Sequence, residues 1–348
     1  MDIFFIEYRD PLFSIIIFFV IIFIITFFSY WWGRYKRKED YKHLNKFLRQ
    51  FRTLPTENEI KVLVANGGLS DKLWFLLANS YYNSGDYEKA IEIYNEMLKR
   101  DGQTNTKEIL FLLGKTYFKA GFLERSKQIF LEILKNNPRT PQALHYLLLV
   151  YEYMRDYQSA LDVLEPLDEL EEDIALESLY LRALILIHDT KIDMDEKKEK
   201  LLAIYREKKM LGYMIFEYFF RVDKEFAWRY LDVSKSEILV DILWNLDLKD
   251  LNLDIISQSE YLRELYTAKG YLNLAESSAV FEFDVLIKLQ AKANATLSFE
   301  YACESCKGVY PFAFHRCSVC HEIDTQRIEW SLTRDYIKDF SEENNSFQ

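Results

Sequence analysis

Glycine, proline and cysteine are all scarce in this chain of 348 residues. It has only 10 glycines and 6 prolines, and its 4 cysteines all lie between residues 303 and 320. A β-sandwich or β-barrel needs many tight turns, so the scarcity of glycine and proline argues against both and favours helices. Any cysteine chemistry is confined to one short window near the end of the sequence.

Positive charge is also scarce over most of the chain. The net charge is −11, yet residues 34–52 carry eight Lys or Arg against two acids, which gives +6. Residues 53–348 then carry 35 basic and 50 acidic residues, which gives −15. Proteins that bind nucleic acid concentrate positive charge on their surface, so nucleic acid is not an expected partner of this acidic bulk.

A long run without charge extends over residues 11–33. A helix of this length, at about 1.5 Å per residue, spans the ~30 Å hydrocarbon core of a bilayer. Tyr30, Trp31 and Trp32 at its end are typical of an interfacial aromatic belt. A cleaved signal peptide is disfavoured because the run is long, its start is acidic and bulky residues follow. The sequence therefore predicts a transmembrane helix over 11–33, preceded by a short external segment, 1–10.

The basic residues directly after this run predict its orientation. Arg34, Lys36, Arg37 and Lys38 should stay on the cytoplasmic side, which places residues 34–348 in the cytoplasm and the N-terminus outside. The same basic block would lie against anionic lipid headgroups. Residues 34–70 are expected to form a juxtamembrane helix and a link. An apolar stripe in that helix is either helix core or the seam of a homodimer.

The middle of the chain shows an internal repeat. Three units, offset by 36 and then 34 residues, share apolar or small residues at equivalent positions: Trp74, Leu77, Ala78, Tyr81, Ala90, Tyr94 and Met97; Leu110, Leu113, Gly114, Tyr117, Ser126, Phe130 and Ile133; Leu144, Leu147, Leu148, Tyr151, Ala160, Leu164 and Leu167. This pattern resembles the tetratricopeptide repeat over residues 71–168. Such units stack into an α-solenoid whose concave surface binds a segment of a partner protein.

The pattern weakens after this array. Residues 169–295 are interpreted as divergent helical repeats, with helices expected at 174–188, 196–209, 211–221 and 224–233, and at 259–294 in two pieces around Gly270. The fold class predicted for the whole chain is therefore mainly α: a transmembrane helix, a tetratricopeptide-repeat solenoid and a small C-terminal metal-binding module. The sequence contains no convincing catalytic constellation and no glycine-rich phosphate loop, so we expect no enzymatic activity.

The cysteines have metal-ligand spacing. Cys303 and Cys306 form one CxxC turn, ten residues follow, and Cys317 and Cys320 form a second. Four thiolates suit a tetrahedral ion, and both zinc and iron accept this ligand set. Disulfides are disfavoured in the reducing cytoplasm, and a redox CxxC usually stands alone at the start of a helix. A closed set of four cysteines leaves no open position, which argues against metal-centred hydrolysis.

Two histidines lie close to the cysteines in the sequence. His315 and His321 are near enough to donate hydrogen bonds to the thiolates, but they are not needed as metal ligands. The predicted metal ligands are therefore the four cysteines alone, with Zn²⁺ as the expected ion and iron as the alternative.

The order of these parts resembles the LapB (YciM) family of lipopolysaccharide assembly proteins. The likeness is carried by YACESCKGVYPFAFHRCSVCHEIDT, which is similar to that family's C-terminal pair of CxxC turns and includes Asp324-Thr325 after the last cysteine. Lys307, His315 and Ser318 depart from the family pattern, which has Gly, Trp and Pro at these positions. The resemblance implies a rubredoxin-like module over 296–330, followed by a tail over 331–348.

The resemblance also implies a function. Family members are adaptors at the cytoplasmic face of the inner membrane that bring the lipid A deacetylase LpxC to the protease FtsH and so limit lipopolysaccharide synthesis. The residues themselves indicate only a tethered scaffold with a metal clip. Two alternatives stay open at this point: an electron-transfer protein with iron in the four thiolates, and a repeat scaffold of another envelope complex.

Overall fold

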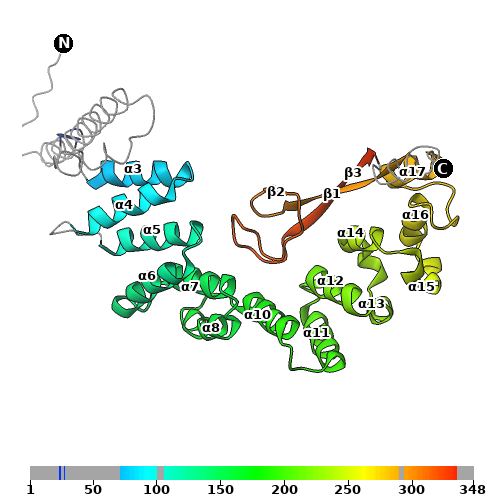
Figure 1. Ribbon diagram of the computed structural model, residues 1–348, viewed down its shortest axis with the longest axis horizontal. Helices are drawn as coiled ribbons and strands as arrows, with labels where there is room; N and C mark the ends of the chain where they lie inside the picture. Colours follow the sequence, from blue (N-terminus) through cyan, green and yellow to red (C-terminus); the bar gives the residue numbers. More distant parts are fainter. Residues whose placement is uncertain (1–22, 25–26, 28–70, 100–105, 290–293, 335–348) are drawn as a thin grey trace, which may run out of the picture. The chain divides into compact units, whose positions relative to one another are not determined.

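The computed structural model describes residues 23–24, 27, 71–99, 106–289 and 294–334. These residues form a mainly helical, tetratricopeptide-like solenoid with a small sheet near the C-terminus (Figure 1). The chain divides into two compact units, Met1–Ala143 and Leu144–Gln348, and each is considered by itself.

Among its described residues, the first unit contains two helix pairs. They are α3 (Asp71–Asn83) with α4 (Tyr87–Leu98), and α5 (Thr106–Lys119) with α6 (Leu123–Asn136). Gly85 and Gly121 adopt positive φ angles of 82° and 81° in the tight turns within each pair, a conformation that costs glycine little. Asp86 caps α4 by accepting a hydrogen bond from the amide of Lys89.

The predicted equivalent positions of these two pairs are buried. Trp74, Ala78, Tyr81 and Ala90 are at most 1% exposed, as the repeat pattern requires for helices that share one core. Gly114 shows why a small residue is needed where two helices cross. A Cβ atom built on it would lie 2.9 Å from the buried ring of Phe130, so even a methyl group would force the helices apart.

The second unit begins with further helices. They are α7 (Pro141–Tyr153, which starts in the first unit), α8 (Tyr157–Asp162), α9 (Leu164–Asp168), α10 (Ala175–His188), α11 (Met194–Lys208), α12 (Gly212–Val222) and α13 (Lys224–Tyr230). The helices expected over 174–233 are confirmed to within a few residues. The second helix of the third repeat is interrupted between α8 and α9, because Pro166 has no amide to continue the hydrogen-bond ladder.

Residues 233–289 differ most from the expectation. No helix was predicted over 234–258, yet this stretch forms η1 (Val233–Leu239), α14 (Val240–Trp244), η2 (Leu248–Asp250) and α15 (Leu253–Gln258). The expected break at Gly270 is present, with α16 (Glu260–Ala268) before it. Its partner α17 (Phe281–Leu289) begins eleven residues later, because the intervening segment is irregular and is held by hydrogen bonds such as Ser278 Oγ to Glu264, 2.6 Å.

A three-stranded antiparallel sheet follows, with the strand order β2-β1-β3. It contains β1 (Ala295–Cys303), β2 (Val309–Tyr310) and β3 (Gln326–Arg334). Ala295 is paired with Arg334 and Cys303 with Gln326, while Tyr301 is paired with Tyr310. Because β1 ends at Cys303 and β3 begins at Gln326, six residues after Cys320, this register brings both CxxC turns to one end of the sheet.

The predicted membrane location needs correction. None of the helices among the described residues has the length and apolar character required to cross a bilayer. The longest of these, α11, has 15 residues and would span only about 22 Å. The single-pass inner-membrane location is therefore not supported. Of the predicted span, 11–33, only Phe23, Ile24 and Phe27 belong to the described residues, and segments 1–10 and 34–70 lie outside them.

Candidate metal centre

Two turns of similar geometry present the cysteines. In the first, the amide of Lys307 donates to the carbonyl of Cys303, 2.9 Å; in the second, the amide of His321 donates to the carbonyl of Cys317, 3.0 Å. Both turns end in the left-handed region, with φ of 61° at Lys307 and 65° at His321. Each turn therefore folds back sharply enough to direct two sulfur atoms toward the other turn.

The structure brings all four predicted ligands together. The Sγ atoms of the cysteines lie within 4.8 Å of one another, and the Cys303–Cys320 and Cys306–Cys317 pairs are each separated by 3.6 Å. A tetrahedral ion with metal–sulfur bonds near 2.3 Å has edges of about 3.8 Å. Cys303 and Cys317 are fully buried, while Cys306 and Cys320 are half-buried. Four free thiols at these distances can bind one metal ion.

Hydroxyl groups support the two buried sulfurs. The hydroxyl of Tyr310 lies 3.2 Å from the Cys317 sulfur, and that of Thr325 lies 3.3 Å from the Cys303 sulfur. Burial opposes ionisation of Cys317, but the hydrogen bonds from Tyr310 and from two backbone amides outweigh it and lower the pKa of this thiol to about 6. The pKa of Cys303 is also lowered, because hydrogen bonds led by Thr325 outweigh burial.

The thiol of Cys320 behaves differently. Burial raises the pKa of Cys320 to about 11, against a weaker opposing hydrogen bond from the amide of Glu322. Thiolate is the form that binds metal, so a cation must displace this proton on binding. Sequence reasoning did not single out Tyr310 or Thr325 as partners of the sulfurs. Their proximity depends on the pairing of β1 with β2 and β3 rather than on spacing.

The two histidines are used differently from the expectation. His315 Nε2 pairs with Glu217 of α12 at 3.0 Å, and this contact lowers the pKa of the Glu217 carboxyl against the effect of burial. The backbone carbonyl of His321 accepts a 2.8 Å hydrogen bond from the guanidinium of Arg316. The predicted donation from His315 to a thiolate is therefore wrong, because its ring is engaged by the helix beneath.

Arg316, next to Cys317, connects the cysteine turns to the helices. Its guanidinium donates to both carboxylate oxygens of Glu177 in α10, at 3.0 and 2.7 Å, and its Nε lies 2.8 Å from Glu152 in α7 as an ion pair. The Arg316 side chain is only 5% exposed and lies over the ring of Tyr180, 5.0 Å from its centroid. A planar, bidentate pair of this kind is geometrically specific.

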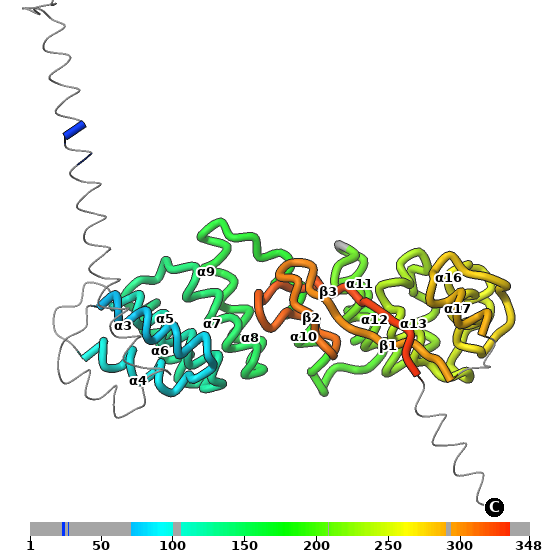
Figure 2. The backbone as a smooth tube through the Cα atoms, turned by 90° about the horizontal axis from the view of Figure 1, so that it is seen from above, coloured from blue at the N-terminus to red at the C-terminus, as the bar shows by residue number. Residues whose placement is uncertain are grey.

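Two further sets of hydrogen bonds attach the sheet to the helices. The carboxylate of Asp324 accepts a 3.0 Å hydrogen bond from the amide of Leu211, which takes a positive φ of 58° at the start of α12. Asp241 of α14 accepts hydrogen bonds from Tyr213 in α12, 2.7 Å, and from Tyr301 in β1, 2.8 Å. Figure 2 shows the strands β1 and β3 passing over α12. The cysteine cluster is thus joined to α7, α10, α12 and α14.

Lys307 provides a direct test of the first CxxC turn. A residue with a side chain is strained at φ 61°, whereas glycine is not. We expect Lys307→Gly to raise the free energy of unfolding by about 0.5–1 kcal/mol, measured by urea denaturation of metal-loaded protein. Lys99→Gly, at a right-handed helix end, serves as the control and should lower it. A loss of stability in the Lys307 variant would contradict the assigned turn geometry.

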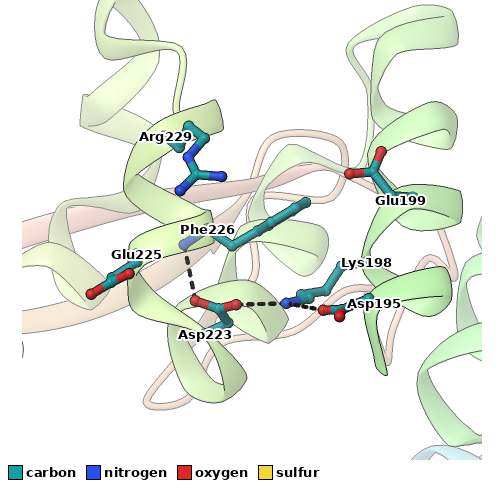
Figure 3. Close-up of a pocket in the computed structure, with 7 residues that line it drawn as sticks. All are labelled: Asp195, Lys198, Glu199, Asp223, Glu225, Phe226 and Arg229. Carbon is teal, nitrogen blue, oxygen red and sulfur yellow. Dashed lines mark hydrogen bonds and ion pairs between the residues drawn. The ribbon is translucent and has the colours of Figure 1, made fainter. Parts of the chain in front are cut away.

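A separate pocket of about 260 Å³ lies between α11 and α13 (Figure 3). Lys198, whose side chain is 8% exposed, is held between Asp195 at 2.7 Å and Asp223 at 2.6 Å. Asp223 also caps α13 through the amide of Phe226, 3.0 Å. The buried ammonium group of Lys198 is thus neutralised by its neighbours, so the pocket is a structural ion-pair site that joins two helices.

Comparison with known proteins supports the repeat assignment. A family model described as tetratricopeptide repeat matches residues 71–103. The chain contains a tetratricopeptide repeat. A search of curated proteins found no match. The repeat points to a protein-binding scaffold rather than a catalyst, and the cysteine cluster lies outside the matched stretch.

Several solved structures are similar to parts of the chain. MamA from Desulfovibrio magneticus RS-1 is 20% identical with a TM-score of 0.36, and the match covers 47% of this chain and 93% of that one. A tetratricopeptide repeat protein from Parabacteroides merdae is 16% identical with a TM-score of 0.38, covering 73% and 96%. At these scores the likenesses carry no argument about function.

Proposed function

We propose that this chain is a non-catalytic adaptor whose repeats bind partner proteins and whose four cysteines hold one structural zinc ion. The observation that carries the proposal is the tetratricopeptide repeat matched over residues 71–103, which covers the helix pair α3 and α4. Stacked repeats present an extended surface to a partner segment, and this surface needs no reactive groups.

In this proposal the zinc ion binds both CxxC turns and so holds the C-terminal module together in a rubredoxin-like arrangement. Four thiolates close the coordination sphere, so the ion contributes folding energy and leaves no position for a substrate. The ordered cysteine turns in turn hold Arg316 against α7 and α10, and Asp324 against the start of α12, through the contacts described above. Iron in the same thiolates would instead favour electron transfer. Metal analysis with an absorption spectrum separates the two, because zinc thiolates are colourless.

The proposed partners follow from the resemblance to the LapB family: the lipid A deacetylase LpxC and the protease FtsH. The adaptor would hold the deacetylase where the protease can degrade it and so limit lipopolysaccharide synthesis. The sequence order of repeats and paired CxxC turns supports this proposal. Asp324 and Thr325 belong to the C-terminal stretch that is similar to that family. Asp324 accepts a hydrogen bond from the Leu211 amide, and the Thr325 hydroxyl contacts the Cys303 sulfur, which gives each residue a structural role.

Site-specific crosslinking tests this partner assignment. A photoreactive residue at Leu76 of α3 is compared with one at Leu131 of α6, because both side chains are 43% exposed. In cells, the Leu76 position should give adducts containing LpxC or FtsH, identified by mass spectrometry, and the Leu131 position should not. Recovery of neither protein from Leu76 would contradict the proposed partners, and a reproducible set of other envelope proteins would assign the scaffold to another complex.

A further inference from the structure

A further pocket, of about 450 Å³, lies between the C-terminal sheet and the helices of the second unit. Most of its lining comes from α12, from α14 and the residues that lead to η2, and from Tyr301 of β1 and Ala313 of the loop between the two CxxC turns. All of these elements belong to one compact unit. The volume falls within the range of about 300–1,000 Å³ that is usual for small-molecule sites.

The lining combines aromatic rings with an excess of carboxylates. The rings belong to Tyr213 and Phe220 of α12 and to Tyr301 of β1. Four acids line the pocket against two bases, a formal charge of −2: Glu217, Asp241, Asp247 and Asp250 against Arg221 and Lys224. Carboxylates and the faces of aromatic rings are the groups that attract organic ammonium ions.

Three of the four carboxylates already have a cation. The ion pairs are those of Glu217 with His315 at 3.0 Å, Asp250 with Lys224 at 2.6 Å and Asp247 with Lys249 at 3.5 Å. Asp247 is 67% exposed, so water screens its charge. The fourth acid, Asp241, is the one that is both buried and without a basic partner.

Asp241 of α14 is only 4% exposed, and no ion pair among the described residues includes it. Its hydrogen-bond donors are neutral: the hydroxyls of Tyr213 at 2.7 Å and Tyr301 at 2.8 Å, and the amide of Ile242 at 2.8 Å. Burial raises the pKa of the Asp241 carboxyl against these hydrogen bonds. A buried carboxylate without a cation is costly, and a cation that enters the pocket offsets that cost.

The two basic residues of the lining are engaged elsewhere. The guanidinium of Arg221 lies over the ring of Tyr218, 5.6 Å from its centroid, and the ammonium group of Lys224 is held by Asp250. Neither forms an ion pair with Asp241. The position of a counter-charge for this carboxylate is therefore open to a ligand.

We propose that this pocket binds the ammonium group of an organic amine, with Asp241 as its counter-charge. The rings of Tyr213, Phe220 and Tyr301 add cation–π attraction, and the alkyl chain of the amine packs along the same rings. This lining suits an amine better than Mg²⁺ or Ca²⁺, which take several oxygen ligands. The ammonium group belongs either to a free polyamine or to a lysine side chain of another protein. The proposal goes beyond the adaptor function and does not depend on which proteins the repeats bind.

Isothermal titration calorimetry on the full, metal-loaded chain tests the proposal with three probes. Spermidine represents a free polyamine, and N-acetyl-lysine methylamide represents a lysine side chain. N-acetyl-norleucine methylamide has a similar shape without the ammonium group. At least one amine probe should bind at one site per chain, about tenfold or more tightly than the norleucine probe. No saturable binding of either amine, or equal binding of the norleucine probe, would overturn the proposal.

The same titrations distinguish the two sources of the amine. Binding of spermidine with weaker or no binding of the lysine probe assigns the site to a free polyamine. Binding of the lysine probe at least as tightly as spermidine assigns it to a lysine side chain of another protein. Both results support an ammonium site, because the two probes share that group.

Isosteric variants locate the site. Asp241→Asn keeps an oxygen that can accept from Tyr213 and Tyr301 but removes the charge, so the better amine probe should bind about tenfold more weakly. Asp254→Asn makes the same charge change at an exposed residue of α15 outside the pocket and should stay within about twofold. Equal losses in the two variants would show a general charge effect and contradict the site.

A second pair of variants does not alter a buried residue. Ala313 is exposed and lines the pocket, so Ala313→Lys should introduce a competing ammonium group and weaken amine binding about tenfold. Leu253→Lys adds the same charge at a 56% exposed residue outside the pocket and should stay within about twofold. Amine binding that survives Ala313→Lys unchanged would place the amine elsewhere and overturn the proposal, even if the Asp241 variant fails to fold.

Discussion

Replacing Arg316 with methionine should lower the free energy of unfolding of the second unit by about 3–5 kcal/mol. The substitution keeps much of the volume but leaves the carboxylates of Glu152 and Glu177 without their cation, and the side chain of Glu152 is only 10% exposed. The loss arises from an unpaired buried charge rather than from a missing surface ion pair. Urea denaturation followed by circular dichroism measures it.

The effect should also depend on pH. Burial raises the pKa of the Glu152 carboxyl, and the positive charge of Arg316 acts in the opposite direction. Without Arg316 the pKa rises further, so the folded state binds a proton more readily than the unfolded state as the pH falls. The loss of stability should therefore be smaller near about pH 6 than near about pH 8.

Arg327→Met is the matched control. Arg327 pairs with Glu329 on the surface of β3, where its side chain is 61% exposed. Exposed pairs contribute about 0–1 kcal/mol, so this variant should stay within that range at both pH values. Equal losses for Arg316→Met and Arg327→Met would mean that the buried arginine does not hold the module on α7 and α10.

Replacing Cys317 with serine should abolish stoichiometric metal binding and unfold the C-terminal sheet. Cys317 is fully buried, and its sulfur lies 3.6 Å from the Cys306 sulfur and within hydrogen-bonding distance of the Tyr310 hydroxyl. A serine at this position therefore removes one of the four sulfur ligands. Structural zinc contributes about 10–16 kcal/mol of apparent binding energy in small domains, and this is coupled to their folding.

Metal content per chain, measured by inductively coupled plasma mass spectrometry, checks the Cys317→Ser prediction. Val319→Ser changes a 61% exposed residue within the same CxxC turn and should keep one metal ion per chain. An unchanged metal content in Cys317→Ser would exclude Cys317 as a ligand. Loss of metal in both variants would show that the turn is sensitive to any substitution.

Local patterns predicted the repeats well. Positions such as Trp74, Tyr81 and Ala90 recur with a fixed offset because each repeat buries the same face, and that regularity is visible in a single sequence. The short helices over 234–258 were missed because they are three to seven residues long and have no apolar periodicity that a window could detect. They are held by contacts such as Tyr266 Oη to the Leu243 carbonyl, 2.9 Å.

The candidate site was predictable only in part. The spacing of the cysteines indicated that four sulfurs would meet, and the structure places them within 4.8 Å of one another. The anchoring residues were not predictable, because Arg316 and Glu177 are 139 positions apart and Asp324 and Leu211 are 113 apart. Such pairs depend on how the sheet sits on the helices. His315 was assigned to the sulfurs by its proximity in sequence, although it faces α12.

The central claim is that a bound metal ion orders the cysteine turns and, through Arg316 and Asp324, the helices on which they dock. Hydrogen–deuterium exchange before and after release of the metal with a mercurial reagent tests it most directly. The account predicts faster exchange in β1 and β3, at the Leu211 amide and in α10 and α12, with α3–α6 unchanged. Metal release that leaves the exchange of Leu211 and α10 unaltered would contradict it.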